Sequence, residues 1–206
     1  MRVYIHVKRI ADFVLAFVNI IALIPLFLLL FTLIKIESPG PVLFKQKRIT
    51  KGKKVFNIYK FRTMRVGTPK NIPTHILNNP DVYITKIGKF LRKISLDELP
   101  QLWNILKGEM SFVGPRPALW NQYNLISKRD KYDANNIRPG LTGLAQICGR
   151  DELKIDKKAE LDGEYVKNIS FLMDIKIFFK TFVHVFKSNG VVEGGTGMLR
   201  EKGNKE

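Results

Sequence analysis

The 206-residue chain has very little cysteine and comparatively few acidic residues. Cys148 is the single cysteine, which excludes a disulfide within the chain and a metal site built from several cysteines. Against 18 Asp and Glu there are 35 Lys and Arg, a formal net charge of +17. Such a surface attracts anions, including nucleic acid, anionic lipid head groups and phosphorylated substrates. Hydrophobic residues make up 45% of the chain, which excludes a wholly disordered protein.

One segment lacks charge altogether. Residues 13–34 form an apolar run of 22 residues without a charged side chain. As one continuous helix the run would be about 33 Å long, at ~1.5 Å per residue, which is close to the thickness of a bilayer core. A cleaved signal peptide fits less well, because no small-residue cleavage pattern follows the run. The run therefore predicts a membrane-inserted anchor.

Basic residues on both sides of this run predict how it enters the membrane. Arg2, Lys8 and Arg9 precede it, and a basic cluster that begins at Lys35 follows it. Both flanks therefore favour the cytoplasmic side. Pro25, near the middle, removes a backbone donor and breaks or kinks a helix. A re-entrant helix that bends at Pro25 and leaves on the side it entered satisfies both flanks, and a kinked single span is the alternative.

The rest of the chain predicts a small, mostly helical α+β domain over residues 37–187 and a polar tail over 188–206. Two runs of β-branched and aromatic residues, 42–49 and 55–64, predict a β-hairpin. Helical spacing predicts short helices over residues 84–94, 99–107, 118–131, 152–168 and 171–187. Residues 66–83 predict a long loop and residues 141–147 a short strand. The aromatic-rich segment 171–187 suits both a core helix and an interfacial helix lying on a membrane.

Two adjacent acids, Asp97 and Glu98, stand at a predicted helix start. The pattern from Ser95 to Glu98 fits a capping box, in which the acids only stabilise the helix N-terminus by ~0.3–1 kcal/mol. Alternatively, one carboxylate acts as a nucleophile while the other binds a metal ion or moves a proton. A carboxylate in that position is expected to have a lowered pKa, and the backbone amides there can hold a phosphate.

Two basic motifs accompany the acids. Prolines on both sides of Arg116 fix its backbone, so the guanidinium loses little entropy when it grips phosphate oxygens. A salt-bridged loop is the plainer interpretation of this motif. Lys60 and Arg62 share one face of a predicted strand, where a solvated basic face is the alternative.

Together these motifs resemble the bacterial sugar transferases, specifically the small monotopic polyprenol-phosphate phosphoglycosyl transferases. The resemblance extends from about residue 5 to the start of the tail. It is carried by Pro25 and by the segments Lys8–Asp12, Ser38–Gln46, Phe56–Met64, Ser95–Gln101, Met110–Pro117 and Arg138–Gly143. One position departs from the pattern. Ile24 precedes Pro25 where family members often carry Ser, which removes a hydroxyl that could satisfy backbone groups freed at the break.

The resemblance implies an activity and roles for named residues. The activity is transfer of a sugar-1-phosphate from a UDP-sugar to a polyprenol phosphate such as undecaprenyl phosphate, with release of UMP and a requirement for Mg²⁺. Asp97 would be the nucleophile that becomes phosphoglycosylated, and Glu98 its metal-binding or proton-handling neighbour. Arg138 would serve the nucleotide side and Asp174 would be a support residue. The residues implied to line the phosphate site are Lys60, Arg62, Arg92 and Arg116.

The resemblance also implies a place and partners. The protein would lie on the cytoplasmic face of the bacterial inner membrane, with residues 1–36 as a re-entrant anchor and residues 37–187 as the catalytic domain. It would begin the assembly of a capsule, exopolysaccharide, O-antigen or glycoprotein glycan. Its partners would be the UDP-sugar, undecaprenyl phosphate and membrane lipids, to which downstream glycosyltransferases or a second copy could be added, but not nucleic acid. The sequence leaves the sugar, the pathway and the oligomeric state open.

Two other classes of function remain open at this point. A non-catalytic, membrane-anchored basic module that binds anionic lipid or nucleic acid would account for the charge and the apolar run. A scaffold subunit of a glycan-assembly complex would retain the fold without the activity. Release of UMP from UDP-sugars separates both from the enzyme.

Overall fold

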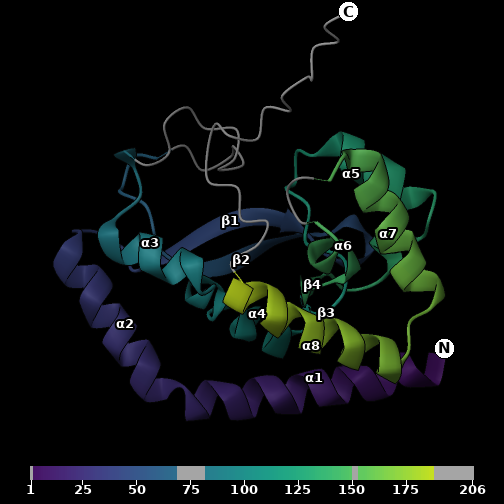
Figure 1. The fold of residues 1–206 in the computed structure, drawn as a ribbon, viewed down its shortest axis with the longest axis horizontal. Coiled ribbons are helices and arrows are strands. Elements are labelled where there is room, and N and C mark those ends of the chain that lie inside the picture. Colours follow the sequence, from purple (N-terminus) through teal and green to yellow (C-terminus); the bar gives the residue numbers. More distant parts are fainter. Residues whose placement is uncertain (1, 69–81, 150–152, 188–206) are drawn as a thin grey trace, which may run out of the picture.

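The computed structural model describes residues 2–68, 82–149 and 153–187. It confirms an α+β, mostly helical chain with a β-hairpin (Figure 1). The predicted tail and most of the predicted 66–83 loop lie outside the described residues. The helices are α1 (Arg2–Ala22), α2 (Ile24–Glu37), α3 (Lys86–Lys93), α4 (Gln101–Lys107), α5 (Tyr123–Asp130), α6 (Leu144–Ile147), α7 (Ile155–Lys167) and α8 (Phe171–Lys187). The strands are β1 (Leu43–Ile49), β2 (Val55–Phe61), β3 (Ser111–Val113) and β4 (Gly140–Thr142).

The apolar run belongs to two helices that meet at a sharp bend. Among the described residues no single helix has both the length and the hydropathy of a membrane span, whereas α1 and α2, bent by 63°, reach them together. Pro25 lies in the first turn of α2, where a missing backbone N–H leaves no helical bond unmade. Figure 1 shows α1 along the lower edge and α2 rising from its end, so that the domain sits inside the angle.

The bend leaves few backbone groups to be satisfied by side chains. The amide of Leu23 donates to the carbonyl of Asn19 at 2.9 Å, and the amide of Phe27 donates to the carbonyl of Leu23 at 2.8 Å. Backbone hydrogen bonds therefore continue across the break. These bonds explain why the break tolerates Ile24, since no serine hydroxyl is needed to satisfy the backbone groups there.

Polar contacts along α1 bind this helix to the domain. Arg9 donates to the carbonyls of Ile105 and Leu106, at 2.7 and 2.9 Å, and so satisfies the end of α4. Lys8 lies 2.5 Å from the carboxylate of Asp174 on α8. Lys8 and Arg9, two of the three basic residues that precede the apolar run, are thus attached to the domain.

The second anchor helix, α2, supports the start of α3. The Glu37 carboxylate accepts hydrogen bonds from the amides of Lys86 and Ile87, at 2.6 and 3.0 Å. The first turn of α3 has no acidic residue of its own, so Glu37 provides the negative charge that a helix N-terminus favours. Below this contact, Leu30 and Ile34 are buried in one cluster with Leu91 of α3 and with Val42 and Phe61.

The predicted hairpin forms, with β1 antiparallel to β2 and Leu43 opposite Phe61. The second strand is shorter than the predicted 55–64, because β2 ends at Phe61, so Arg62 does not share the strand with Lys60. Its far end is extended by an amide-to-carbonyl bond from Ile49 to Ala118 at 3.0 Å. The prediction of a helix from residue 118 is wrong at its start, because residues 118–119 pair with the hairpin and α5 begins only at Tyr123.

The predicted 141–147 strand is also only partly right. β4 pairs in parallel with β3 and ends at Thr142, after which α6 begins. The backbone of residues 140–143 passes very close to Gly114. A Cβ on Gly140 would lie 2.1 Å from the Gly114 nitrogen, and a Cβ on Gly143 would lie 2.1 Å from the Gly114 oxygen. This close approach ends the strand pairing early and requires residues without side chains.

Helix α8 has the predicted bounds and serves the core with one face. Asp174 and Ile177 are buried, while Phe171, Leu172 and Phe179 are well over half exposed. In Figure 1, α8 runs above α1. The exposed apolar face has the composition expected of a helix at a membrane interface, and that placement stays a prediction.

We expect the bent pair to enter and leave a membrane on one side. A cysteine at Val3, which is 77% exposed, in a Cys148→Ser background reports the side on which the N-terminus lies. In a Gram-negative host with only the outer membrane opened, an impermeant thiol reagent should not label it. Labelling should appear after the inner membrane is permeabilised.

A cysteine at the exposed residue Lys157 is the matched control for the domain. Both cysteines should behave alike in the re-entrant arrangement. Labelling of the Val3 cysteine alone before permeabilisation would establish a true span and contradict the expectation. Pro25→Leu should move the result toward that outcome.

Candidate active site

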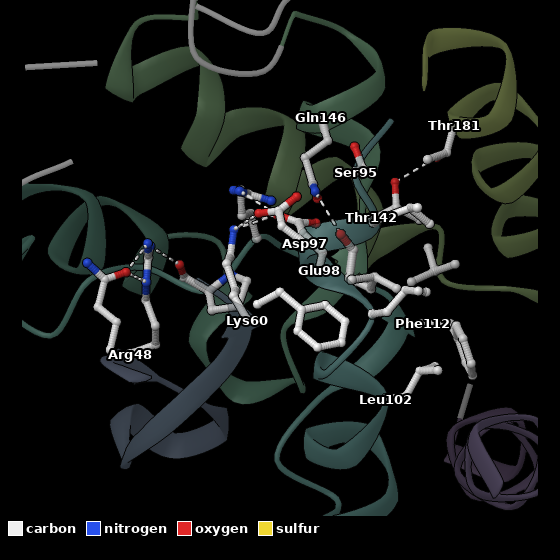
Figure 2. Close-up of a pocket in the computed structure, with 18 of the residues that line it drawn as sticks. Arg48, Lys60, Ser95, Asp97, Glu98, Leu102, Phe112, Thr142, Gln146 and Thr181 are labelled. Carbon is white, nitrogen blue, oxygen red and sulfur yellow. Dashed lines mark hydrogen bonds and ion pairs between the residues drawn. The ribbon is translucent and has the colours of Figure 1, made fainter. Parts of the chain in front are cut away.

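A cavity of about 1070 Å³ lies between the anchor, the hairpin and helices α3 to α8. One part of its lining is apolar and another part is charged. Side chains from α1 and α8 contribute an apolar wall, which includes Leu15, Phe178 and Phe182. Around Asp97 and Glu98 the lining is charged, and Figure 2 shows this region in close-up. The cavity therefore offers a place for a charged group and an apolar group side by side.

The two acids do not stand on an α-helix. They lie on a 3₁₀ turn, Leu96–Glu98, and α4 starts three residues later. Ser95 has a left-handed backbone, with φ 58°, and its side chain makes no cap hydrogen bond. The predicted capping box is therefore wrong, because the carboxylate of Glu98 turns toward cations and away from the Ser95 amide.

Lys60 and Arg116 hold Glu98 from two sides. Lys60 Nζ lies 2.7 Å from Glu98 Oε1, and an Arg116 guanidinium nitrogen lies 3.1 Å from the same oxygen. Lys60 Nζ also lies 3.8 Å from Asp97 Oδ2, so the lysine bridges the two acids. Figure 2 shows Lys60 extended toward the pair from β2.

The pKa values of the two acids move apart. Burial raises the pKa of Asp97 to about 6, although Lys60 opposes this rise, and the neighbouring charge of Glu98 adds to it. Burial also acts to raise the pKa of Glu98, but Lys60 and Arg116 outweigh it and hold that pKa well below its usual range. The expectation of a lowered pKa is therefore wrong for Asp97. It is right for Glu98, but the cause is the two neighbouring cations and not a helix N-terminus. The environment of the pair thus favours the protonated form of Asp97 more than that of Glu98.

The other residues implied by the resemblance fall into two groups. Arg92 lines the cavity, and its charge lowers the pKa of Asp97. Arg62 also borders the cavity, but its guanidinium donates to the carbonyls of Ser38 and Pro39, at 2.5 and 2.9 Å. It thereby fixes the turn between anchor and domain. The described hydrogen bonds of the Arg62 guanidinium therefore go to the backbone of this turn, and none of them goes to the acids.

Arg138 and Asp174 make no described contact with the acid pair, although Asp174 lines the same cavity. Arg138 Nε donates to the Gly108 carbonyl at 2.8 Å, and Arg138 is not among the described residues that line the cavity. Asp174 accepts from Tyr165 at 2.7 Å and from Tyr4 at 2.6 Å, in addition to Lys8. Asp174 thus joins α8 to α1 and α7, which agrees with a support role.

Sequence reasoning missed the residues of α5, α6 and α7 that line the cavity. Arg129 and Asp162 form a buried ion pair, with contacts of 2.8 and 2.6 Å, at the edge of the cavity. Lys158 and Gln146 line the same side. No short motif links these residues, which come from three separate helices, so no local signal could have identified them.

Few acidic side chains are available to hold a metal ion at this site. In the part of the chain that the structure describes, no group of three or more His, Cys, Asp or Glu side chains could enclose a metal. Mg²⁺ needs fewer, because it commonly binds one or two carboxylates together with substrate phosphates. Asp97 and Glu98 are adjacent, and Glu98 Oε2 takes part in none of the described hydrogen bonds. The pair therefore fits a Mg²⁺ ion shared with a bound diphosphate.

Acids held among fixed cations, beside an apolar wall, form an arrangement that suits the binding of phosphate groups. The comparison with known families agrees. The chain belongs to the family described as Bacterial sugar transferase, which it matches over residues 3–188.

Three curated relatives are each about 40% identical to this chain in sequence. Exopolysaccharide production protein ExoY of Sinorhizobium fredii is 39% identical over 197 residues, which cover 89% of this chain and 87% of that protein. UDP-N-acetylgalactosamine-undecaprenyl-phosphate N-acetylgalactosaminephosphotransferase of Aeromonas hydrophila is 40% identical, over 87% of this chain and 43% of its own length. UDP-glucose:undecaprenyl-phosphate glucose-1-phosphate transferase of Escherichia coli is 41% identical, over 87% and 39%. The chain thus spans most of ExoY and less than half of the other two.

The charges around Asp97 should control its pKa in opposite directions. Lys60→Met removes a cation that stabilises the carboxylate, so the pKa of Asp97 should rise above about 6. Glu98→Gln removes a repelling anion, so that pKa should fall. Carbon-13 NMR of aspartate-labelled protein measures both, with Asp97→Asn assigning the signal. Shifts of the same sign in the two variants would contradict this account.

Proposed function

We propose that this protein transfers a sugar-1-phosphate from a UDP-sugar to a polyprenol phosphate, with undecaprenyl phosphate as the acceptor, and releases UMP. The observation that carries the proposal is the Asp97–Glu98 pair, held by Lys60 and Arg116 at a cavity that also has an apolar wall. The names of two relatives specify undecaprenyl phosphate and a sugar phosphate, and a third specifies exopolysaccharide production. The product would then start a glycan at the membrane.

The reaction would run in two displacements at one phosphorus atom. A carboxylate oxygen of Asp97 attacks the phosphorus that bears the sugar, and the bond to the bridging oxygen breaks, so UMP leaves. The sugar phosphate is then held on Asp97 as an acyl phosphate. An oxygen of the polyprenol phosphate attacks the same phosphorus, the bond to Asp97 breaks, and polyprenol diphosphate sugar leaves with Asp97 restored.

Fixed cations make the first displacement feasible. A carboxylate that approaches a diphosphate meets repulsion between like charges, and groups already in position for phosphate oxygens reduce it. Lys60, Arg92 and Arg116 would do so from β2, α3 and the 114–117 turn. Asp97 suits the attacking role because it is ionised above pH 6, whereas Glu98 is committed to its cations. Mg²⁺, held by Glu98 and Asp97 when bound, would neutralise part of the diphosphate charge.

The acceptor explains the apolar wall and the anchor. A polyprenol tail stays in the bilayer and its phosphate lies at the surface, so the site must lie there too. The bent pair α1–α2 and the exposed face of α8 would hold the cavity at that depth, on the cytoplasmic face where nucleotide sugars occur. Residues 1–36 would be the anchor and 37–187 the catalytic domain, with later glycosyltransferases or a second copy as neighbours. A basic module without catalysis does not explain two acids buried together, which only weaken anion binding.

Asp97 is expected to carry the sugar phosphate. Incubation with the UDP-sugar alone, chosen from a panel of UDP-hexoses and UDP-N-acetylhexosamines, should release about one UMP per active protein. Intact mass should then rise by one phosphosugar. Asp97→Asn removes the nucleophile and should abolish both signals while the thermal unfolding curve stays close to that of wild type.

The matched control is Asp130→Asn, an exposed acid of similar chemistry on α5. It should release UMP like wild type. Repeated turnover by Asp97→Asn would sink the covalent mechanism. If wild type released no UMP from any donor in the panel, the proposed function itself would fail.

The reaction is expected to require Mg²⁺. Excess chelator should reduce UMP release to background, and added Mg²⁺ should restore it. Glu98→Gln should both lower activity and raise the Mg²⁺ concentration needed for half of the maximal rate. Undiminished release in chelator would contradict the assigned metal.

Arg116→Lys is expected to cost far more than a conservative exchange suggests. The Arg116 guanidinium contacts Glu98 and is 42% exposed at the cavity, so it can grip a phosphate with its planar fork. Lysine keeps the charge and loses the fork, and kcat/KM for the donor should fall at least tenfold. A rate within a few-fold of wild type would show that only the charge matters.

A further inference from the structure

The turn that carries Asp97 begins at a residue whose side chain has no assigned task. Ser95 has φ 58° and ψ 21°, a left-handed conformation that is uncommon for a residue other than glycine. Such backbone is retained where the surroundings hold it, often at functional sites. The Ser95 hydroxyl has no hydrogen-bond partner among the described residues, yet Ser95 lines the cavity. The turn therefore keeps an uncommon conformation and leaves a hydroxyl at the cavity.

Gln146 of α6 is a second polar side chain that the described contacts leave incomplete. Its Nε2 donates to the Leu141 carbonyl at 2.9 Å, which fixes the orientation of the amide. Its Oε1 is buried and has no hydrogen-bond partner within the described residues, although Gln146 is only 8% exposed. Native proteins seldom leave a buried acceptor unsatisfied unless a ligand or water supplies the donor.

Both side chains belong to the cavity that contains the acids. Ser95 and Gln146 line it together with Asp97, and Figure 2 labels both in the part of the cavity that contains the acid pair. Gln146 offers an acceptor and Ser95 offers a hydroxyl, so they can accept from and donate to a ligand hydroxyl. Among the groups of the proposed reaction, hydroxyls belong to the UDP-sugar. The polyprenol phosphate has none to offer once its phosphate is ionised.

We propose that Ser95 and Gln146 bind the transferred sugar through its hydroxyl groups and thereby select the sugar. This inference rests on the proposed function. Asp97 is expected to hold the sugar phosphate after UMP has left, so groups beside Asp97 contact the part of the donor that stays. A site that hydrogen-bonds a hydroxyl rejects an analogue that lacks it, because its own polar groups are then left unpaired.

The test compares substitutions at the two residues with one outside the cavity. Gln146→Met removes the acceptor at nearly constant volume, and Ser95→Ala removes the hydroxyl. Ser95→Gly does the same without strain, should Ser95→Ala fail to fold. Gln101→Met is the matched control, since Gln101 is a buried glutamine with an unpaired Nε2 that does not line the cavity. Donor kcat/KM should fall about tenfold in the Gln146 and Ser95 variants, the size expected for one lost hydrogen bond, and stay near wild type in the control.

Two further measurements identify the group that is bound. Inhibition by UMP should change less than twofold in all variants, because UMP contains no transferred sugar. Wild type should discriminate at least tenfold against one UDP-sugar analogue that lacks a single sugar hydroxyl. That discrimination should shrink to about twofold in Gln146→Met or in the Ser95 variant.

Distinct results overturn the inference and the proposed function. Variants with wild-type kcat/KM and unchanged discrimination would refute the sugar contact while leaving an active wild type in place. A loss of UMP affinity that parallels the loss of kcat/KM would assign these residues to the nucleoside and also refute it. A wild type that releases no UMP from any donor would instead refute the proposed function, and the inference with it.

Discussion

Burying two adjacent carboxylates is the constraint on which the candidate site depends. Asp97 and Glu98 repel each other, and burial disfavours the charge of both. Only cations fixed close by make the arrangement stable, and Lys60, 2.7 Å from Glu98, is the central one. The hairpin, the 3₁₀ turn and the 114–117 turn must therefore meet, because each supplies one part of the charge balance. The result is a division of labour in which one acid stays ionised and the other has a pKa close to neutrality.

The bent helix pair α1–α2 is part of the same charge balance, because both helices contact the elements that carry the site. Glu37, at the end of α2, caps the helix that carries Arg92, and Arg9, on α1, satisfies the end of α4. A change in the angle between α1 and α2 would move α3 and with it a cation near Asp97. The bend at Pro25 thus sets cavity geometry as well as the path of the chain. The contacts of Glu37 and Arg9 also explain how an apolar helix pair is attached closely to a strongly basic domain.

Much of the secondary structure was predictable, because it depends on local pattern. The hairpin, α3, α7, α8 and the break at Pro25 follow from periodicity, turn residues and one proline. Predictions failed where a contact distant in sequence took over. Residues 118–119 pair with the hairpin, and the strand at 141 gives way to α6 under the crossing with Gly114. In the candidate site, the acids, Lys60 and Arg116 were identifiable from motifs, and Arg92 from the family resemblance alone, whereas Gln146 and the Arg129–Asp162 pair were not.

The sequence by itself determined the uncharged apolar run, the excess of positive charge and the family. Composition and the order of motifs along the chain can be read without the fold. Tertiary structure decided what each charged side chain does. Glu98 has the position of a capping residue, yet Lys60 and Arg116 draw it away from the helix start. Arg62 looks equivalent to Lys60 on the strand, yet it donates to the carbonyls of Ser38 and Pro39. Partners brought together from distant parts of the chain set these pairings and the pKa values that follow, and no local pattern encodes them.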